Sequence, residues 1–317
     1  MERTSKPSAW RVLLAFAIIY VVWGSTFLAI RVGVREVPPF LLAGLRFLIA
    51  GIVLYAWMRA KGTQSPALRE WGAVLLLAVL IFVFDYGLLF WAERRVPSGI
   101  AAVMMATIPV FMAISEILIL RTQRLSARLA IGLLVGTGGV TVLVSRRLGF
   151  GEVPIDTAGA CALIVAAISW SLASALTRRL PLPAAKAMSS GAQMLSGGVL
   201  LVLTAALLGE FRGFHVDTVS RKAWLALAYL IVLGSIVAFT AYVWLLHYES
   251  PTRVGTYAYV NPVVAVLVGY FLGGEALGPR MIVGTVLVLV SVVVITTTPA
   301  KKSKTDRWRG QPQEVKR

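Results

Sequence analysis

The sequence predicts an all-α membrane protein with ten transmembrane helices, arranged as two inverted five-helix repeats around a central cavity. Hydrophobic residues make up 58% of the 317 residues and charged residues only 14%, and the mean hydropathy is +0.81, a composition typical of a chain solvated by lipid. Apolar runs of about 20 residues, the length a helix needs to cross a bilayer, recur along the whole chain. The two halves of the chain also share a pattern of Trp, Gly and Pro residues.

The apolar runs define the individual helices. They place the spans at residues 12–31, 38–57, 71–92, 98–120, 127–145, 156–177, 187–208, 224–246, 253–273 and 279–298. The first run follows basic residues, as a signal peptide would, but it is too long for one and is followed by further spans, so we expect it to be retained. The connections are mostly short, which leaves no room for a soluble enzyme domain.

The chain divides into four regions on this pattern. They are a cytoplasmic N-terminus (1–11), a first repeat (12–145), a second repeat (156–298) and a basic tail (299–317) whose composition predicts disorder. A net charge of +17 could indicate nucleic-acid binding, but the basic residues follow the positive-inside rule, with 20 on the side of the N-terminus and 10 on the other, or 13 against 10 without the tail. We therefore expect an inner-membrane protein with both termini cytoplasmic and no nucleic-acid partner.

The repeat is visible as matched residues at fixed shifts along the chain. A shift of 153 residues aligns Trp91 with Trp244 and Pro109 with Pro262; a shift of 147 aligns Trp23 with Trp170, Gly44 with Gly191, Arg46 with Gln193 and Gly51 with Gly198. Each half therefore has five spans, and an odd number forces the two copies into opposite orientations. Inverted repeats are a recurrent architecture of secondary transporters, in which two halves expose a central site alternately to either side of the membrane.

These residues also carry a family resemblance. Trp23-Gly24-Ser25-Thr26-Phe27 in the first span, Arg46 in the second, and Pro-centred fourth and ninth spans followed by Gly-Glu-x-Leu resemble the EamA-type transporters of the drug/metabolite transporter superfamily. The resemblance covers about residues 12–298. It implies a basket of helices around a central cavity, with the fifth and tenth helices at the periphery, and export of small metabolites.

The two copies depart from each other after the Pro-centred spans. The first copy has Thr122-Gln123-Arg124 where the second has Gly274-Glu275-Ala276. If Glu275 caps a helix or forms an ion pair, only the second repeat can do so at this position.

Ionisable side chains inside a bilayer are costly, so each one is a candidate functional group that needs a partner. The spans contain three of them, Arg46, Asp85 and Glu116. Arg46 and Asp85 lie at similar depths in antiparallel neighbouring spans, which predicts a salt bridge between them. Either this pair is structural, or it contacts the substrate or a proton; a buried pair is weak evidence for stability.

One face of the fourth span is a candidate cavity wall. Its members recur at spacings of three and four: Ser98, Ala102, Met105, Pro109, Met112 and Glu116. Proline removes one backbone hydrogen bond and leaves a carbonyl free for a ligand or another helix. The alternative is a packing seam in which Glu116 is merely solvated near the membrane surface.

Polar and aromatic side chains at mid-span positions complete the predicted site. Hydroxyl and amide groups of the ninth span can bind a substrate or a neighbouring helix, and the two matched tryptophans, with other aromatic and soft side chains, suit an apolar pocket for a small molecule. The candidate substrate-binding residues are Trp23, Ser25, Phe84, Asp85, Tyr86, Met105, Pro109, Glu116, Trp170, Tyr257, Tyr259 and Asn261. Bulk packing is the alternative role for each of them.

The chain shows no metal-ligand spacing, nucleophile motif or phosphate loop, so we expect neither an enzyme nor a bound metal or cofactor. The hypothesis is a secondary transporter that exports a small amphipathic metabolite, an amino acid or drug-like solute, by alternating access, with Asp85 and Glu116 as candidate proton carriers. The alternatives are a non-transporting scaffold or channel-like pore and, less favoured, a membrane-embedded enzyme. The expected partners are the substrate and the lipid bilayer. Gly132-x-x-x-Gly136 permits close helix contact within one chain or in a homodimer, so a monomer and a homodimer are both open.

Overall fold

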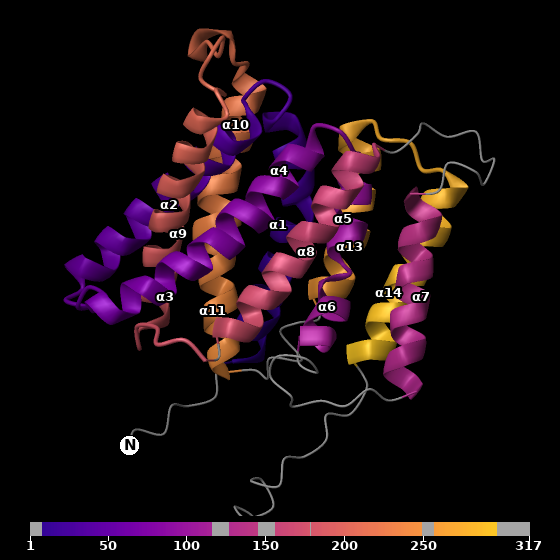
Figure 1. The fold of residues 1–317 in the computed structure, drawn as a ribbon, viewed down its shortest axis with the longest axis horizontal. Coiled ribbons are helices and arrows are strands. Elements are labelled where there is room, and N and C mark those ends of the chain that lie inside the picture. Colours follow the sequence, from indigo (N-terminus) through magenta and orange to yellow (C-terminus); the bar gives the residue numbers. More distant parts are fainter. Residues whose placement is uncertain (1–7, 116–126, 145–155, 178, 249–256, 297–317) are drawn as a thin grey trace, which may run out of the picture.

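The computed structural model describes most of the chain. The described residues are 8–115, 127–144, 156–177, 179–248 and 257–296. Within them all regular structure is helical and forms ten spans (Figure 1), which confirms the predicted fold class. Six of these described spans are long and apolar enough to cross a membrane by themselves, and the others contain shorter apolar helices. The predicted tail and most of the predicted N-terminal segment lie outside the described residues.

Each repeat contributes five spans. The first repeat consists of α1 (Ala9–Gly33), α2 (Pro39–Ala60), a third span of α3 (Leu68–Ala78), the π-helical segment η1 (Val79–Gly87) and α4 (Leu88–Glu93), a fourth span of α5 (Ser98–Met105) and α6 (Ile108–Ser115), and α7 (Ala127–Val144). The second repeat consists of α8 (Thr157–Thr177), α9 (Lys186–Leu207), an eighth span of α10 (Arg221–Tyr229), the π-helical η4 (Leu230–Val237) and α11 (Ala238–Tyr248), then α13 (Tyr257–Gly273) and α14 (Pro279–Thr296). A short 3₁₀ turn, η3 (Val216–Thr218), precedes α10.

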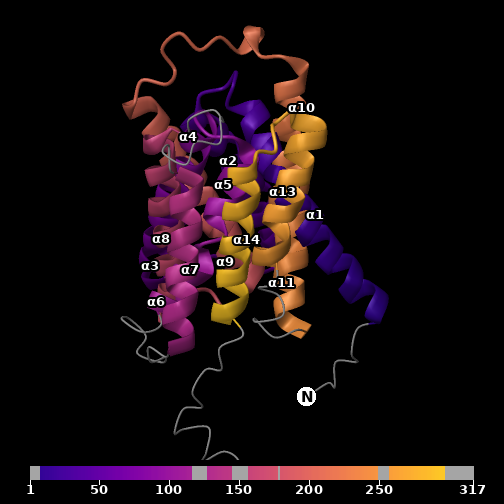
Figure 2. The same cartoon turned by 90° about the vertical axis from the view of Figure 1, so that its right-hand side faces the viewer.

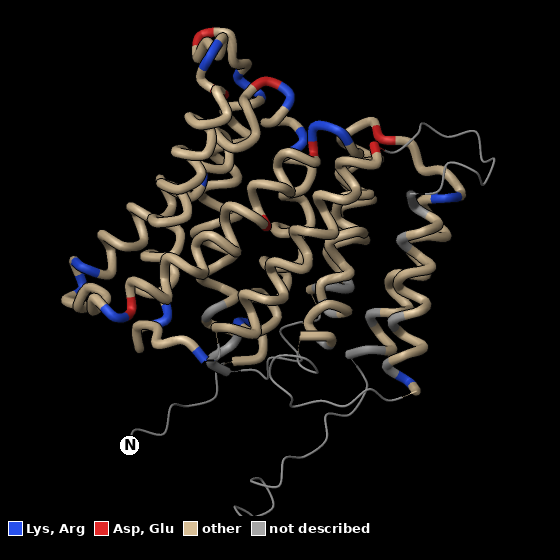
Figure 3. Tube along the Cα trace, viewed as in Figure 1, with Lys and Arg blue, Asp and Glu red and all other residues tan. Residues whose placement is uncertain are grey.

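The charged side chains gather at the two ends of the bundle and leave its middle almost entirely apolar (Figure 3). This is the distribution that a bilayer selects, because helices satisfy their own backbone groups and the ends meet water. We call the end opposite the N-terminus the distal end; it contains the connections at residues 34–38, 94–97, 208–220 and 274–278. Two of these connections turn at glycines with positive φ, Gly209 (72°) and Gly274 (65°).

The second and seventh spans, α2 and α9, pack against each other on the side of the bundle away from α7 and α14 (Figure 1), and glycines make the contact close. A Cβ atom on Gly51 would lie 2.3 Å from the backbone nitrogen of Leu195, and one on Gly198 would lie 2.3 Å from that of Leu48. Gly51 and Gly198 are matched positions of the two repeats, and each lies against the backbone of the facing helix in the opposite repeat in the same way. This reciprocal, antiparallel contact is what a two-fold relation between inverted repeats requires.

The fifth and tenth spans, α7 and α14, pack against each other at one edge of the bundle, on the right of Figure 1 and nearest the viewer in Figure 2, as the family resemblance implied. A Cβ atom on Gly136 would lie 2.4 Å from the hydroxyl of Ser291. That hydroxyl donates a hydrogen bond to the carbonyl of Gly132, at 2.7 Å. The Gly132-x-x-x-Gly136 pattern therefore serves a helix contact within the chain.

The fourth span differs from the single helix predicted over 98–120. It is interrupted after Met105, and α6 begins at Ile108. The physical reason is Pro109, which lacks the N–H that would continue the helix. The carbonyl of Ile108, at the start of α6, accepts a hydrogen bond from the hydroxyl of Ser171 in α8, at 3.1 Å, so α8 contacts the chain beside the break.

Candidate substrate site at the middle of the bundle

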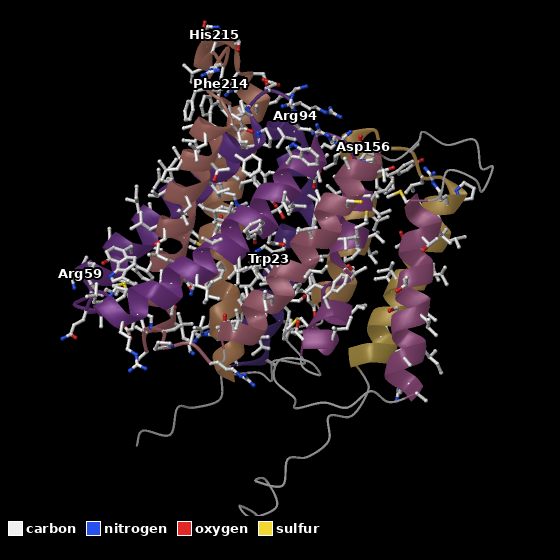
Figure 4. The ribbon with its side chains drawn as sticks, viewed as in Figure 1. Trp23, Arg59, Arg94, Asp156, Phe214 and His215 are labelled. Atoms are coloured by element: carbon white, nitrogen blue, oxygen red, sulfur yellow. The ribbon has the colours of Figure 1, made fainter. Side chains whose placement is uncertain are left out.

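The third and eighth spans each change to a π-helix at mid-span, η1 in one repeat and η4 in the other. π-Helical turns leave carbonyls available and are frequent at functional sites. Each segment is held by a side chain of the opposite repeat: Trp23 Nε1 donates to the carbonyl of Gly234 at 3.1 Å, and Ser169 Oγ donates to that of Leu80 at 2.8 Å. Figure 4 shows Trp23 at the middle of the bundle. The two repeats are thus cross-bonded at membrane depth.

Arg46 of α2 lies buried between these segments, with 2% of its surface exposed. Its Nε donates to Ser235 Oγ of η4 at 2.9 Å. Its guanidinium carbon lies 4.6 Å from the ring centre of Phe47 and 5.4 Å from that of Tyr86, within the range of a cation–π interaction. One terminal nitrogen, Nη1, is buried without a hydrogen-bond partner. The arginine therefore keeps one donor free inside the bundle.

Asp85 of η1 is the second buried charged residue at this depth, also 2% exposed, and its Oδ1 has no hydrogen-bond partner. The predicted salt bridge between Arg46 and Asp85 is wrong for this structure, because no nitrogen–oxygen pair of the two lies within 4.0 Å. Similar depth does not fix the direction of a side chain. Arg46 points to the eighth span, where its Nε donates to Ser235 Oγ.

The aromatic side chains at the depth of Arg46 and Asp85 form two clusters. In the first cluster, Trp23 packs on Tyr242 and Tyr257, with ring centres 5.2 and 5.1 Å apart. In the second, Tyr86 packs on Phe47 at 4.5 Å and on Trp170 at 6.1 Å. The first cluster joins spans one, eight and nine, and the second joins spans two, three and six.

Other predicted site residues have mixed outcomes. Ser25 Oγ shares a hydrogen bond with the hydroxyl of Tyr229 at 2.6 Å. Asn261 is buried and its Oδ1 has no hydrogen-bond partner. Met105 lies in the main hydrophobic core, so packing accounts for it.

Phe84 does not join the aromatic clusters. Its side chain is 46% exposed, because successive residues of a helix point in different directions and Asp85 and Tyr86 take the inward ones. Glu116 lies outside the described residues, as do the side chains of Pro109 and Tyr259.

Several contact residues were not predicted. Ser235, Tyr229 and Tyr242 come from the eighth span, which has no ionisable residue at mid-span to attract notice. A shift of about 150 residues, which aligns η1 with η4, would have matched Ser235 to Asp85. In the part of the chain that the structure describes, no group of three His, Cys, Asp or Glu residues could hold a metal ion.

At the distal end, glutamates bind helix starts of the opposite repeat. Glu275 accepts from the backbone nitrogen of Ser98 at 2.8 Å, from its hydroxyl at 2.7 Å, and from the nitrogen of Gly99 at 3.1 Å, all at the start of α5. Glu210 accepts from the nitrogens of Phe40 and Leu41 in α2, at 3.4 and 2.9 Å. Carboxylates at helix N-termini satisfy free N–H groups and the helix dipole. We call these two contacts and the following one the distal clamp.

The third clamp contact joins Glu36 to Ser220 at the start of α10, through the backbone nitrogen at 2.5 Å and the hydroxyl at 2.7 Å. These two hydrogen bonds lower the pKa of Glu36 from its ordinary value. Burial raises the pKa of Glu210, an effect that the hydrogen bonds from Leu41 and Phe40 partly oppose. The distal clamp therefore contains one carboxylate that favours its charged form and one that resists it.

Ten helices in two inverted repeats, with charged and aromatic side chains buried together at mid-depth, define an inverted-repeat membrane transporter. The model of the EamA-like transporter family matches residues 10–145 and 157–297, one copy for each repeat. The chain belongs to this family, which confirms the resemblance seen in the sequence.

Named relatives agree with this assignment. The chain is 36% identical over 284 residues to the "Uncharacterized inner membrane transporter YedA" of Escherichia coli (strain K12), and the match covers 89% of each chain. It is 27% identical over 277 residues to "Protein PecM" of Dickeya dadantii (strain 3937), covering 86% of this chain and 88% of that one. A solved crystal structure with 24% identity and a TM-score of 0.60, covering 90% of this chain and 96% of its own, has the same fold.

Proposed function

We propose that this transporter exports a small amphipathic metabolite with an amino and a carboxylate group, such as an aromatic amino acid, across the inner membrane by alternating access. In this proposal both termini are cytoplasmic, as the excess of basic residues on their side favours, and the distal end faces outward. The observation that carries the proposal is the pair of buried side chains Arg46 and Asp85, each with an unpartnered polar atom.

Leaving buried charged groups without a partner is costly. Buried polar atoms in proteins nearly always have partners, and an unpartnered one is a reason to look for a missing ligand. A substrate carboxylate would supply the acceptor that Nη1 of Arg46 lacks, and a substrate ammonium would supply the donor that Oδ1 of Asp85 lacks. Because the charges have opposite signs and do not pair with each other, a zwitterion suits both.

The aromatic clusters support an apolar part of the substrate. Trp23, Tyr242 and Tyr257 belong to one cluster and Tyr86 and Trp170 to the other. Sites for small molecules combine an apolar lining with a few placed polar groups. Because each cluster joins spans of both repeats, a movement of one repeat against the other would change the surroundings of the substrate.

The test is counterflow of labelled L-phenylalanine in proteoliposomes, with two competitors that each lack one charge. Phenethylamine lacks the carboxylate and 3-phenylpropionate lacks the ammonium, so the wild-type protein should prefer L-phenylalanine over each by about 10- to 100-fold, as expected for a hydrogen bond to a charged group. Arg46→Gln should remove the discrimination against phenethylamine, and Asp85→Asn that against 3-phenylpropionate.

Gln193→Leu is the matched control, because Gln193 is the counterpart of Arg46 in the second repeat and its amide binds only its neighbour Ser189 in the contacts described, at 3.0 Å. This variant should keep both preferences. Equal competition by all three compounds against the wild-type protein would contradict a zwitterion site, and the absence of saturable counterflow would contradict transport of this substrate class.

A further inference from the structure

Glu93, the last residue of α4, is a buried carboxylate that the proposed substrate site does not use. It is 0% exposed, and neither of its side-chain oxygens has a hydrogen-bond partner. The predicted third span ends at residue 92, which leaves Glu93 in the connection that follows it. The structure instead places it inside the distal end of the bundle, beneath the distal clamp.

One arginine stands between Glu93 and the clamp. Arg31 of α1 donates through Nη1 to the backbone carbonyls of Glu93 and Val96. Its Nε lies 3.9 Å from Oε1 of Glu275 and has no hydrogen-bond partner of its own. Arg31 thus links α1 and the end of α4 to the glutamate that binds the start of α5.

The charges in this cluster balance only if Glu93 is neutral. The carboxylate of Glu275 receives three hydrogen bonds at the α5 N-terminus and the charge of Arg31. An ionised carboxylate on Glu93 would have none of these and would be buried without compensation, at a cost that proteins avoid by neutralising the group. Glu93 therefore holds a proton in this conformation.

Few charged residues lie on the described helices that pack against α4. Of the helices packed against α4, α5 and α8 have no charged residue within their bounds. α1 has Arg31 in its last turn and Arg11 in its first, α2 has Arg46 near its middle and Arg59 in its last turn, and η1 has Asp85. Arg94 and Arg95 follow Glu93 in the connection after α4. Arg94 acts electrostatically on Glu210, and Nε of Arg95 lies 4.0 Å from Oδ1 of Asp156. Arg31 and Glu275 are the charged groups that act on Glu93 electrostatically.

We propose that Glu93 binds the proton that drives export, in exchange for one substrate molecule moved outward per proton moved inward. This rests on the proposed function. Glu93 takes the proton from water on the distal side when the clamp is open. It releases this proton to the cytoplasmic side before the next substrate molecule leaves on the distal side. With the proton bound, Arg31 stays with Glu275 and the distal clamp holds α5. Without it, two carboxylates compete for Arg31, which loosens the clamp and favours the state open to the distal side.

The experiment uses proteoliposomes containing the full-length protein and labelled L-phenylalanine, with a gradient of one pH unit across the membrane. For one proton per substrate, that gradient should produce about a tenfold accumulation in the wild-type protein, since one pH unit corresponds to a tenfold equilibrium ratio. In Glu93→Gln, the accumulation of L-phenylalanine with the gradient divided by that without it should fall to about 1, the value for uncoupled sites. Counterflow without a gradient should persist.

Asp156→Asn is the control, because Asp156 is an exposed acid at the same end of the bundle; it should accumulate L-phenylalanine as the wild-type protein does. Unchanged accumulation by Glu93→Gln would overturn the proposal. So would a wild-type protein that shows counterflow but no accumulation under a pH gradient, or accumulation that a sodium gradient drives instead.

A second measurement needs no transported solute and so separates this proposal from the proposed function. The infrared carbonyl stretch of protonated carboxylic acids in the purified wild-type protein at neutral pH should lose the component of Glu93 in Glu93→Gln and keep it in Asp156→Asn. Asp85→Asn identifies the component of the other buried acid, Asp85. If Glu93→Gln fails to fold, Glu93→Asp should shift the stretch and keep gradient-driven accumulation. A wild-type spectrum without the component of Glu93 refutes a proton on Glu93, whereas missing L-phenylalanine counterflow with that component present refutes only the substrate class.

Discussion

The two repeats of this protein have nearly the same frame and different charges. Both contribute a glycine to the close contact of α2 and α9, both contain a π-helical segment in their third helix, and both receive a hydrogen bond on that segment from the opposite repeat. The charged residues at mid-depth, Arg46 and Asp85, belong to the first repeat alone, and the second has Gln193 and Ser235 at the matching places. A duplicated frame can move symmetrically while its site recognises an unsymmetrical molecule.

The largest expected effect concerns the frame. Gly51→Ala and Gly198→Ala would each place a methyl group 2.3 Å from a backbone nitrogen of the facing helix, and backbone atoms cannot move aside as a flexible side chain can. We expect each to destabilise the fold by at least about 3 kcal/mol, the upper range for overpacking. The thermal midpoint and the yield of monodisperse protein measure this.

Gly72→Ala is the control, because its Cβ atom would meet nothing within 4 Å. A large loss of stability in only one of the variants Gly51→Ala and Gly198→Ala would contradict the reciprocal contact of α2 and α9.

The next effect concerns the charges. If the two repeats were equivalent, the double exchange Arg46→Gln with Gln193→Arg would restore the transport that Arg46→Gln alone removes. We expect no restoration, because the guanidinium in its native place is held by Ser235 and three aromatic rings. Counterflow of L-phenylalanine should stay about 10- to 100-fold below wild type in both variants. Recovery in the double variant would show that either repeat can supply the charge.

A smaller difference separates the matched tryptophans. Trp23→Phe keeps an aromatic ring but loses the hydrogen bond to the carbonyl of Gly234, which should lower stability by about 1 kcal/mol. Trp170→Phe removes no hydrogen bond among those described and retains the ring that faces Tyr86, so it should cost less. Thermal midpoints of the two variants, measured side by side, decide this. Equal losses would mean that the hydrogen bond of Trp23 adds nothing to ring packing.

The smallest effect is the pH dependence of the distal clamp, where two glutamates should act with opposite signs. The pKa of Glu36 is lowered in the folded state, so its contribution to stability is present above the unfolded pKa and is lost as pH falls through the folded pKa. The pKa of Glu210 is raised, so the folded state binds more protons there, and stability falls as pH rises from the unfolded to the folded pKa.

Thermal midpoints of Glu36→Gln and Glu210→Gln, followed across acidic to neutral pH, measure these signs. Glu36→Gln should lower the midpoint at neutral pH and approach wild type in acid. Glu210→Gln should reduce the loss of stability that the wild-type protein shows on going from acid to neutral pH. The same slope in both variants would contradict the assignment.

Much of the fold could be predicted from the sequence, and part of the site. The matched Trp23 and Trp170 do lie at mid-depth against the π-helical span of the opposite repeat. Arg46 and Asp85 were found as buried charges, but their pairing was predicted wrongly, because sequence position gives the depth of a residue and leaves the rotation of its helix undetermined. The π-helical segments were not predicted either, since a single wide turn changes no residue in the hydropathy pattern.

By itself the sequence determined the number of helices, their inversion and the family, because a bilayer requires each helix to be a long apolar segment that satisfies its own backbone hydrogen bonds. These requirements are local and can be read from any segment alone. Tertiary structure decided that Arg46 reaches Ser235, 189 positions away in the chain, and that Arg31 links Glu275 to the end of α4. Such partners depend on how helices from both repeats rotate and cross, and close packing at glycines such as Gly51 and Gly198 fixes that geometry.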